Sequence, residues 1–319
     1  MTRTAHLFIR MLRWRVAVTL WAFLLLGAAA QGPIRPTVSL FLTAVALCAS
    51  YVVATTVNDV ADQDIDRINH PLDAGRPLVT GDASERDLWR TNAVAAPVAI
   101  IAAALAGAPT LGLTVASLAI GYSYSLRPIR LAYRTWAAPV ILAVAYVLVP
   151  YGLGMFAAGG GIDTTDGLLA AALYMLFVAR INLKDFRDRE GDAAFGKPTL
   201  LLAHGKTATC AVSLVGVLLG NLVESYGSAH LIVHGGRSRR FAITLLTAIG
   251  LALGFATVLG GTALADASDK AIGAAQAVSA GAILAVVSIA IIPHTFSEVS
   301  RRVAIATMLG FLGGYLLST

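Results

Sequence analysis

Two aspartate-rich runs contain the residues whose types and spacing are best suited to chemistry. The first run reads Asn58-Asp59-x-x-Asp62-x-x-x-Asp66, and the second reads Lys184-Asp185-x-x-Asp188-x-x-x-Asp192. A shift of 126 positions superimposes all three aspartates of the two runs. Each run follows an apolar stretch of the chain, so the two halves of the sequence repeat one plan. Functional sites of membrane proteins often lie at the interface between such repeats.

The spacing of the two runs predicts a metal site. Residues at i, i+4 and i+8 share one face of a helix, and like charges on that face repel each other unless a cation lies among them. If each run continues the helix before it, six side chains line the two faces: Asn58, Asp62, Asp66, Lys184, Asp188 and Asp192. Mg²⁺ binds a few carboxylates and leaves its other positions to water and phosphate. Solvated helix ends are the simpler alternative, but they do not explain a second copy in matched register.

Basic residues surround both runs and indicate a substrate that carries phosphate. They are Arg67, Arg76, Arg127, Arg130, Lys184, Arg187 and Lys197. Carboxylates for Mg²⁺, together with Arg and Lys for phosphate oxygens, are typical of diphosphate binding. Arg180 lies within an apolar stretch, where a charge usually faces the protein interior, so it is a further candidate. The sequence has no GxxxxGK[ST] loop, which argues against a nucleoside triphosphate.

The elements that position these residues are expected to be membrane-spanning helices. Of the 319 residues, 57% are hydrophobic and 13% are charged, and the mean hydropathy is +0.75. Nine apolar blocks are each nearly free of charge, and a helix of about 20 such residues crosses a bilayer. They are 16–30, 38–57, 93–106, 137–158, 167–178, 207–223, 241–261, 271–292 and 302–318. We expect an all-α, polytopic transmembrane bundle of nine or ten spans, and leave open whether 207–223 spans the membrane or is re-entrant.

The distribution of basic residues predicts the orientation in the membrane. The formal net charge is +6, and the basic residues concentrate in the N-terminal tail and in 58–90, 127–134 and 184–206. Cytoplasmic loops carry such an excess of Lys and Arg, so both aspartate-rich runs are expected on the cytoplasmic side of a cell or plasma membrane. Arg237, Arg239 and Arg240 depart from this pattern if 207–223 spans. Nucleic-acid binding is not expected, because the basic residues alternate with spans and do not form one patch.

At this point the sequence resembles the UbiA-type intramembrane prenyltransferase superfamily. The two aspartate-rich runs are similar to the paired aspartate motifs of that family. Gly75-Arg76-Pro77-Leu78-Val79-Thr80-Gly81 is similar to the RPLxxG run that follows the first motif. Phe195-Gly196-Lys197-Pro198-Thr199-Leu200 is similar to the sequence after the second. The resemblance extends from about residue 10 to about residue 290.

The resemblance implies nine helices around a central cavity and transfer of a prenyl group from a prenyl diphosphate, with Mg²⁺ as the cofactor. It implies that Mg²⁺ is bound by Asn58, Asp62, Asp66, Asp188 and Asp192, of which the four aspartates are the predicted catalytic residues. Asp59 and Asp185 complete the predicted metal set. The predicted diphosphate-binding residues are Arg67, Arg76, Arg127, Arg180 and Lys184. The family's acceptors are mostly aromatic rings, and some are lipids.

Tyr122, Tyr124 and His70 are the candidates for acceptor binding. The family often has a Tyr-x-x-x-Lys element after the fourth span, but Leu126 occupies the lysine position here and Arg127 is the nearest cation. The two tyrosines also suit an interfacial aromatic belt, and His70 precedes a proline turn. The sequence favours an aromatic acceptor, phenolic or a quinone precursor, within a protein surrounded by membrane lipid.

The predicted domain organisation is one transmembrane domain over 1–319, with internal halves at about 15–134 and 136–319 that each carry one aspartate-rich run. Three alternative functions use the same features. A terpene cyclase or a phosphoribosyl transferase would need the same metal site. A transporter of divalent cations or lipids also suits repeated halves with carboxylates, but here the carboxylates lie at one membrane face.

Overall fold

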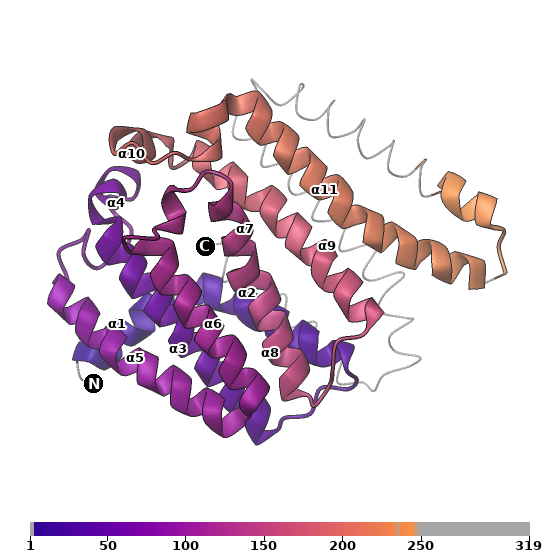
Figure 1. The fold of residues 1–319 in the computed structure, drawn as a ribbon, viewed down its shortest axis with the longest axis horizontal. Helices are drawn as coiled ribbons and strands as arrows, with labels where there is room; N and C mark the ends of the chain where they lie inside the picture. Colours follow the sequence, from indigo (N-terminus) through magenta and orange to yellow (C-terminus); the bar gives the residue numbers. More distant parts are fainter. Residues whose placement is uncertain (1–2, 235, 246–247, 249–319) are drawn as a thin grey trace, which may run out of the picture. The chain divides into compact units, whose positions relative to one another are not determined.

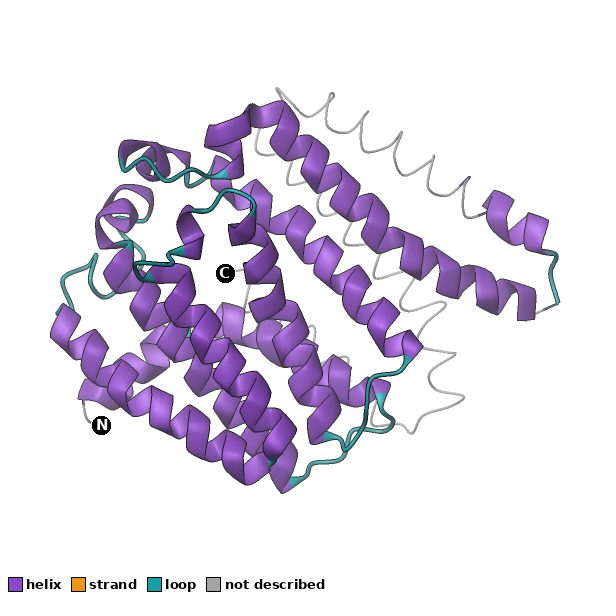
Figure 2. Cartoon of the chain, in the orientation of Figure 1, coloured by secondary structure: helices purple, strands orange, loops and turns teal. Residues whose placement is uncertain are grey.

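The computed structural model describes residues 3–234, 236–245 and 248, and every regular element in that part of the chain is helical (Figures 1 and 2). The chain divides into two compact units, Met1–Ser228 and Ala229–Thr319, and each is described by itself. Within the described residues, the second unit has the end of the last long helix and a short helix from 239 to 245. The predicted all-α fold is confirmed for the described residues.

The helices of the first unit follow one another with short connections. Their bounds are α1 (Arg3–Met11), α2 (Trp14–Ala30), α3 (Val38–Ala61), α4 (Gln63–Asn69), α5 (Glu85–Ala106), α6 (Ala108–Ser125), η1 (Leu131–Tyr133), α7 (Ala137–Ala143), η2 (Val144–Leu148), α8 (Val149–Ala157), α9 (Thr164–Ile181), η3 (Asn182–Phe186), α10 (Arg189–Ala194) and α11 (Leu200–His234), which runs into the second unit.

Five segments in the described residues are helical, long and apolar enough to cross a membrane. They are Val38–Ala61, Glu85–Ala106, Ala137–Ala157, Asp166–Phe186 and Leu200–Gly220. The pair α1 and α2, bent by 64°, would make a sixth. The predicted number of nine or ten spans is not confirmed, because the predicted spans 241–261, 271–292 and 302–318 lie mainly or wholly outside the described residues. The predicted span 207–223 lies within α11.

Polar side chains at the helix starts decide where three of these helices begin. Thr37 accepts a hydrogen bond from a backbone N–H in the first turn of α3. Ser84 and Asp87 form a capping box at the start of α5, and Asp163 and Asp166 form one at the start of α9. Such contacts satisfy N–H groups that have no partner within the helix. The capping box explains why α5 begins at Glu85 and not at the apolar run that starts at residue 93.

Glycines allow α2 and α8 to cross at close range. A Cβ atom added to Gly27 would overlap the Tyr151 carbonyl, and one added to Gly154 would overlap the Leu24 carbonyl. In a bilayer, where lipid is as apolar as the side chains, such small residues let two backbones approach and gain van der Waals contact. The crossing holds α8 and the segment before it against α2.

The three charged segments predicted to be cytoplasmic come together at one end of the first unit. The Lys197 ammonium pairs with Asp62 at 2.9 Å, and the Arg130 guanidinium lies 4.0 Å from the same carboxylate. At the opposite end, Gln31 donates a 2.8 Å hydrogen bond to Asp166. The helices therefore separate a highly charged end from an end with little charge.

Candidate active site

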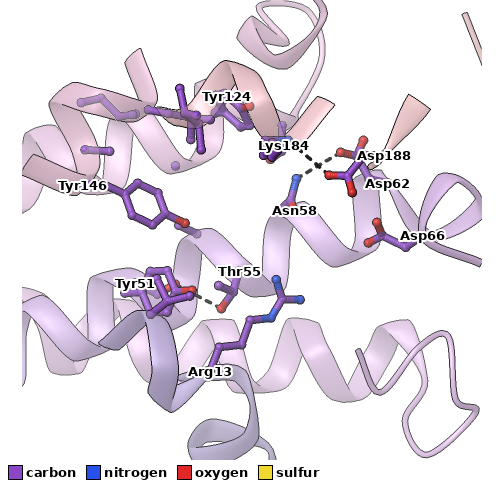
Figure 3. Close-up of a pocket in the computed structure, with 18 of the residues that line it drawn as sticks. Arg13, Tyr51, Thr55, Asn58, Asp62, Asp66, Tyr124, Tyr146, Lys184 and Asp188 are labelled. Carbon is purple, nitrogen blue, oxygen red and sulfur yellow. Dashed lines mark hydrogen bonds and ion pairs between the residues drawn. The ribbon is translucent and has the colours of Figure 1, made fainter. Parts of the chain in front are cut away.

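A cavity of about 350 Å³ opens at the charged end of the first unit. Its polar end is lined by residues of both aspartate-rich runs: Asn58, Asp62, Asp66, Lys184, Asp188 and Asp192. Its deeper wall is formed mainly by apolar and aromatic side chains: Val16, Leu20, Leu47, Tyr51, Ile120, Tyr124, Leu142 and Tyr146. Figure 3 shows the carboxylates of Asp62, Asp66 and Asp188 gathered at one end, with Tyr51 and Tyr146 deeper inside.

The first run spans a break between two helices. The sequence argument assumed a helix that continues through this run, whereas α3 ends at Ala61 and α4 begins at Gln63. At the break the Asp62 N–H still donates to the Asn58 carbonyl, and the Asp66 N–H donates to the Asp62 carbonyl, both at 2.9 Å. These bonds keep the i, i+4, i+8 register across the break, so Asn58, Asp62 and Asp66 line the same cavity.

The second run has the same break at the equivalent position. Helix α9 tightens into the 3₁₀ segment η3, and α10 begins after Asp188. The Asp188 N–H donates to the Lys184 carbonyl at 3.1 Å, and the Asp192 N–H donates to the Asp188 carbonyl at 3.2 Å. Helices α4 and α10 then pack against each other, as Figure 1 shows at the upper left. This contact brings the two runs together, as the repeat predicted.

Each of the four carboxylates on the cavity wall has a cation or a histidine close to it. The pairs are Asp62 with Lys197, Asp66 with Arg76, Asp188 with Lys184, Arg187 and His70, and Asp192 with Lys197. The Lys197 ammonium lies 2.9 Å from Asp62 Oδ2 and 3.9 Å from Asp192 Oδ1, so one cation joins the two runs. Cations therefore balance the negative charge at the polar end of the cavity.

The oxygen groups on the cavity wall fit Mg²⁺. Among the described residues, no three His, Cys, Asp or Glu side chains lie close enough together to form a ready-made metal site. Asp192 Oδ2 is nevertheless buried and has no hydrogen-bond partner in the described part of the chain. A buried acceptor in that state lacks a partner that a ligand could supply. With the Asn58 amide oxygen, the four carboxylates offer an all-oxygen set, which Mg²⁺ prefers.

Burial changes the acid–base properties of groups around the cavity. It raises the pKa of Asp192, although the charge of Lys197 opposes the change. Burial and the charge of Arg13 lower the pKa of Arg76 to about 10, so Arg76 remains protonated at neutral pH. Burial also lowers the pKa of His70, although Asp188 opposes it, and His70 is therefore mostly uncharged at neutral pH. Perturbed groups in a cavity are typical of functional sites.

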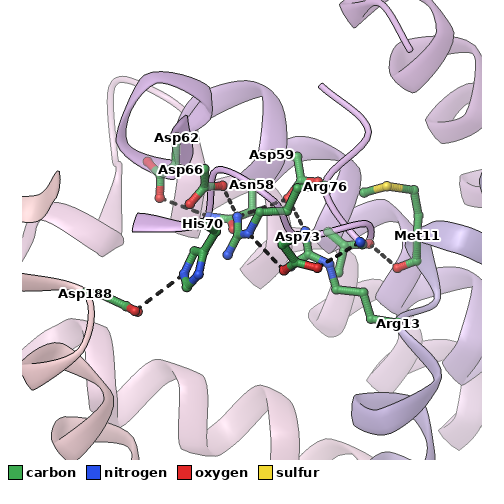
Figure 4. Close-up of polar contacts among 12 residues, drawn as sticks. Met11, Arg13, Asn58, Asp59, Asp62, Asp66, His70, Asp73, Arg76 and Asp188 are labelled. Atoms are coloured by element: carbon green, nitrogen blue, oxygen red, sulfur yellow. Dashed lines mark hydrogen bonds and ion pairs between the residues drawn. The ribbon is translucent and has the colours of Figure 1, made fainter. Parts of the chain in front are cut away.

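Two aspartates of the predicted metal set do not line the cavity. Asp59 is buried beneath it and forms ion pairs with Arg13 and Arg76, as Figure 4 shows for the Arg76 side of the network. Asp185 lies beside a smaller neighbouring cavity of about 30 Å³, where its carboxylate is 3.5 Å from Lys184. Both residues support neighbouring cations and do not face the other four carboxylates.

The predicted diphosphate-binding residues also divide into two groups. Arg76 and Lys184 line the cavity. Arg67 is exposed and pairs with Asp64 at 2.8 Å, and Arg127 is exposed and lines a neighbouring pocket that shares Asp62 and Ile65 with the cavity. Arg180 is exposed and does not line the cavity.

The acceptor candidates lie in different places. Tyr124 and His70 line the cavity. Tyr122 packs in the core between α3, α5 and α6, and its hydroxyl donates a 2.7 Å hydrogen bond to Asn92. The structure therefore leaves two of the three candidates within reach of a bound molecule.

Three further cavity residues were not predicted from the sequence. Tyr51 lies seven residues before Asn58, two helical turns away on the same face, so its spacing was a usable signal. Arg13 enters the cavity at the bend between α1 and α2, where its φ is 44°. Tyr146 enters from η2, a π-helical segment inside an apolar span. A backbone bend and a π-helical segment have no composition signal of their own.

Residues 16–267 match the model of the UbiA prenyltransferase family. The chain belongs to this family. The resemblance that the two motifs indicated is therefore confirmed. The family consists of membrane-bound enzymes that transfer isoprenoid groups. The matched segment covers most of the first unit, including both aspartate-rich runs.

Two relatives and one solved structure are similar to the chain. A digeranylgeranylglyceryl phosphate synthase of Methanoculleus marisnigri is 36% identical over 210 residues, which cover 63% of this chain and 70% of the relative. The bacteriochlorophyll synthase 34 kDa chain of Chloroflexus aurantiacus is 28% identical over 209 residues, which cover 62% and 64%. A UbiA homolog from Archaeoglobus fulgidus, bound to DMAPP and Mg²⁺, superposes with a TM-score of 0.58 at 20% identity, covering 80% of this chain and 87% of the other. This last likeness is one of fold.

Proposed function

We propose that this UbiA family member is an integral membrane enzyme that transfers a prenyl group from a prenyl diphosphate to an aromatic acceptor, with Mg²⁺ as cofactor. The observation that carries the proposal is the cavity itself, in which two matched sets of carboxylates and cations occupy one end and apolar and aromatic side chains the other. A diphosphate head and a hydrocarbon tail need these two environments side by side.

Asn58, Asp62, Asp66, Asp188 and Asp192 are the proposed Mg²⁺ ligands. When bound, Mg²⁺ supplies positive charge that neutralises the leaving diphosphate. Asp59 and Asp185 are left out of the proposed ligand set, because they do not line the cavity.

The cations that now pair with the carboxylates are the proposed diphosphate ligands. Arg76, Lys184, Arg187 and Lys197 all line the cavity, and their charged groups are within reach of its polar end. When a diphosphate enters, its oxygens offer these cations stronger, charge-assisted hydrogen bonds. We place Arg67, Arg127 and Arg180 outside this set because of their positions on the surface or in another pocket.

The deeper wall suits the reaction that follows. The C1–O bond of the donor breaks with its electron pair remaining on the diphosphate, and the allylic cation is then attacked at C1 by the acceptor, which loses a proton. Leu20, Leu47 and Leu142 keep water away from that cation. The Tyr146 ring, stacked on Phe177 with centroids 5.5 Å apart, presents an aromatic surface to the same cavity. Aromatic faces attract cations.

An aromatic acceptor is favoured by the tyrosines that line the wall, Tyr51, Tyr124 and Tyr146. Offset stacking on such rings holds a planar acceptor. The relatives' names indicate one lipid product, digeranylgeranylglyceryl phosphate, and one ring product, bacteriochlorophyll. A lipid acceptor is therefore the alternative to test directly.

The test is diphosphate release by the purified full chain in detergent, with geranyl, farnesyl or geranylgeranyl diphosphate, with and without Mg²⁺. The acceptors are a panel of phenolic acids, a chlorophyllide and a prenylated glyceryl phosphate. Release that needs both Mg²⁺ and a ring acceptor supports the proposal. Release that needs the prenylated glyceryl phosphate would show that the acceptor is a lipid and not an aromatic ring. Release without any acceptor indicates a cyclase, and no release under any condition favours the phosphoribosyl transferase or the transporter.

A further inference from the structure

Asn69, the last residue of α4, joins the two aspartate-rich runs through its side chain. Its amide Nδ2 donates a 2.9 Å hydrogen bond to the Asp188 carbonyl. Its Oδ1 accepts a 2.8 Å hydrogen bond from the Gly191 N–H. Asn69 is half-buried and lines the cavity beside the carboxylates. One neutral side chain thus satisfies two backbone groups of the opposite run.

The two bonds lie where they determine the separation of the carboxylates. Asp62 and Asp66 lie at the start of α4 and within it, and Asp188 and Asp192 occupy the equivalent positions of α10. Asn69 is bonded to the backbone at Asp188 and at Gly191, next to Asp192. Any change in these two bonds therefore moves one pair of carboxylates relative to the other.

Gly191 shows that the two helices are already at their closest approach here. A Cβ atom added at Gly191 would lie 2.7 Å from Asn69 Oδ1 and 2.7 Å from the Ile65 carbonyl oxygen. A separation below 3.0 Å requires one of the groups to move, and the Ile65 oxygen is backbone that does not swing aside. Glycine at this position is what allows the Asn69 side chain to span the gap.

A neutral clamp suits this location. Four carboxylates face one another across the gap, and like charges repel. The cations that balance them, such as Lys197 and Arg76, are also the proposed ligands of the diphosphate, so they cannot hold the gap and bind substrate at the same time. Among the described residues, the Asn69 amide bonds only to backbone groups, for which a bound substrate does not compete.

We propose that Asn69 is a positioning residue that sets the distance between the two carboxylate pairs and thereby the affinity for a prenyl diphosphate with Mg²⁺. The proposal rests on the proposed function, because it assumes that both runs bind one ligand. The proposal predicts that Asn69 affects the affinity for the ligand, which a contribution to folding alone would not do.

The test compares Asn69→Ala with Asn92→Ala in the full chain. Asn92 is a matched control, because its amide donates to Thr56 Oγ1 at 2.9 Å and to the Val53 carbonyl at 3.3 Å, joining α5 to α3 away from the cavity. Both variants lose an amide that links two helices, and Asn92 is the more buried. Calorimetry measures the Kd of geranyl diphosphate at saturating Mg²⁺, and thermal unfolding is recorded without ligand.

We expect Asn69→Ala to weaken geranyl diphosphate binding by about tenfold or more, the range found when a residue that orients metal ligands is removed. Asn92→Ala is expected to lower the unfolding midpoint and to leave the Kd of the folded fraction unchanged. Equal Kd values for Asn69→Ala and the wild type would overturn the inference while leaving the proposed function intact. If the wild type itself binds none of geranyl, farnesyl and geranylgeranyl diphosphate with Mg²⁺, the proposed function fails, and the inference fails with it.

Gly191→Ala tests the same gap from the other side and keeps Asn69. It is expected to weaken binding to a similar extent, because α10 must move away from the Ile65 carbonyl. Since both changes act on one separation, the double variant is expected to bind little worse than either single variant. Should Asn69→Ala fail to fold, the Kd of geranyl diphosphate is measured for Asn69→Gln in its place. This variant keeps both polar groups on a longer side chain. Full additivity in the double variant, or unchanged binding by Gly191→Ala, would also overturn the inference.

Discussion

At the scale of single residues, the aspartates of the two runs have different surroundings and therefore different expected roles. Asp62 and Asp188 occupy equivalent helix breaks and line the cavity. Asp59 lies at the same place in the first run as Asp185 in the second, yet neither lines the cavity. The helical spacing of the sequence placed Asp62, Asp66, Asp188 and Asp192 on shared faces, and these four line the cavity. The breaks after Ala61 and Phe186 could not be predicted, because they are features of backbone geometry.

Asp62→Ala and Asp188→Ala are predicted to lower the rate of diphosphate release by at least about 100-fold, since each removes charge that the reaction needs at the polar end of the cavity. Asp64→Ala is the control. Its carboxylate is exposed and pairs only with Arg67 among the described residues, and such surface pairs contribute little. The rates are compared at saturating Mg²⁺ after confirming equal amounts of membrane-inserted protein. Near-normal turnover in either cavity variant is incompatible with the assigned site.

Asp59→Asn is predicted to act on stability. The change leaves the neighbouring guanidinium groups of Arg13 and Arg76 without their shared, buried counter-charge. Removing one partner of a buried ion pair costs about 3 kcal/mol. We therefore expect a clearly lower midpoint in thermal unfolding of the detergent-solubilised protein. If Asp59→Asn unfolds like the wild type but no longer binds Mg²⁺, Asp59 is a ligand after all.

At the scale of helices, the apolar blocks predicted the positions of helices where composition determines them, and did not predict irregular backbone within a helix. The predicted spans 16–30 and 38–57 correspond to α2 and α3. The predicted span 137–158 contains the π-helical segment Val144–Leu148, just before Pro150. Proline lacks the N–H that a regular helix uses at that point, and π-helical segments often occur at functional sites. The irregular segment turns Tyr146 toward the cavity, which no pattern of composition predicts.

The crossing of α2 and α8 gives a prediction at this scale. Gly27→Ala is expected to destabilise the protein by about 1–3 kcal/mol, because the added methyl group overlaps the Tyr151 carbonyl and forces the helices apart. Gly112→Ala is the matched control, since a Cβ atom there meets nothing within 4 Å. Alanine stabilises a helix slightly relative to glycine. Thermal unfolding of the two variants is compared, and equal midpoints would show that the crossing is not tightly packed.

At the scale of the whole molecule, the repeat of the two runs was visible in the sequence and becomes the α4–α10 contact in the structure. The single domain over 1–319, with halves at about 15–134 and 136–319, stays a prediction. So does the cytoplasmic location of the charged end. It is supported by the clustering of 58–90, 127–134 and 184–206 at one end of the first unit.

Cysteine labelling in intact cells checks the orientation. With Cys48 and Cys210 replaced by serine, a cysteine at exposed Asp64 marks the charged end, and one at Gly161 marks the opposite end. We expect a membrane-impermeant maleimide to label Gly161→Cys in intact cells and Asp64→Cys only after lysis. The reverse pattern would invert the predicted topology without moving the site within the fold.

Diphosphate release from geranyl diphosphate with and without chelator tests the central claim most directly, namely that the paired runs act on a prenyl diphosphate through Mg²⁺. With a competent acceptor, the purified wild-type chain is predicted to release diphosphate in Mg²⁺, to stop in excess EDTA and to recover when Mg²⁺ is restored. Because the resting carboxylates are balanced by Arg76, Lys184 and Lys197, the protein is expected to remain folded throughout. Undiminished release in excess EDTA by the folded protein would contradict the account.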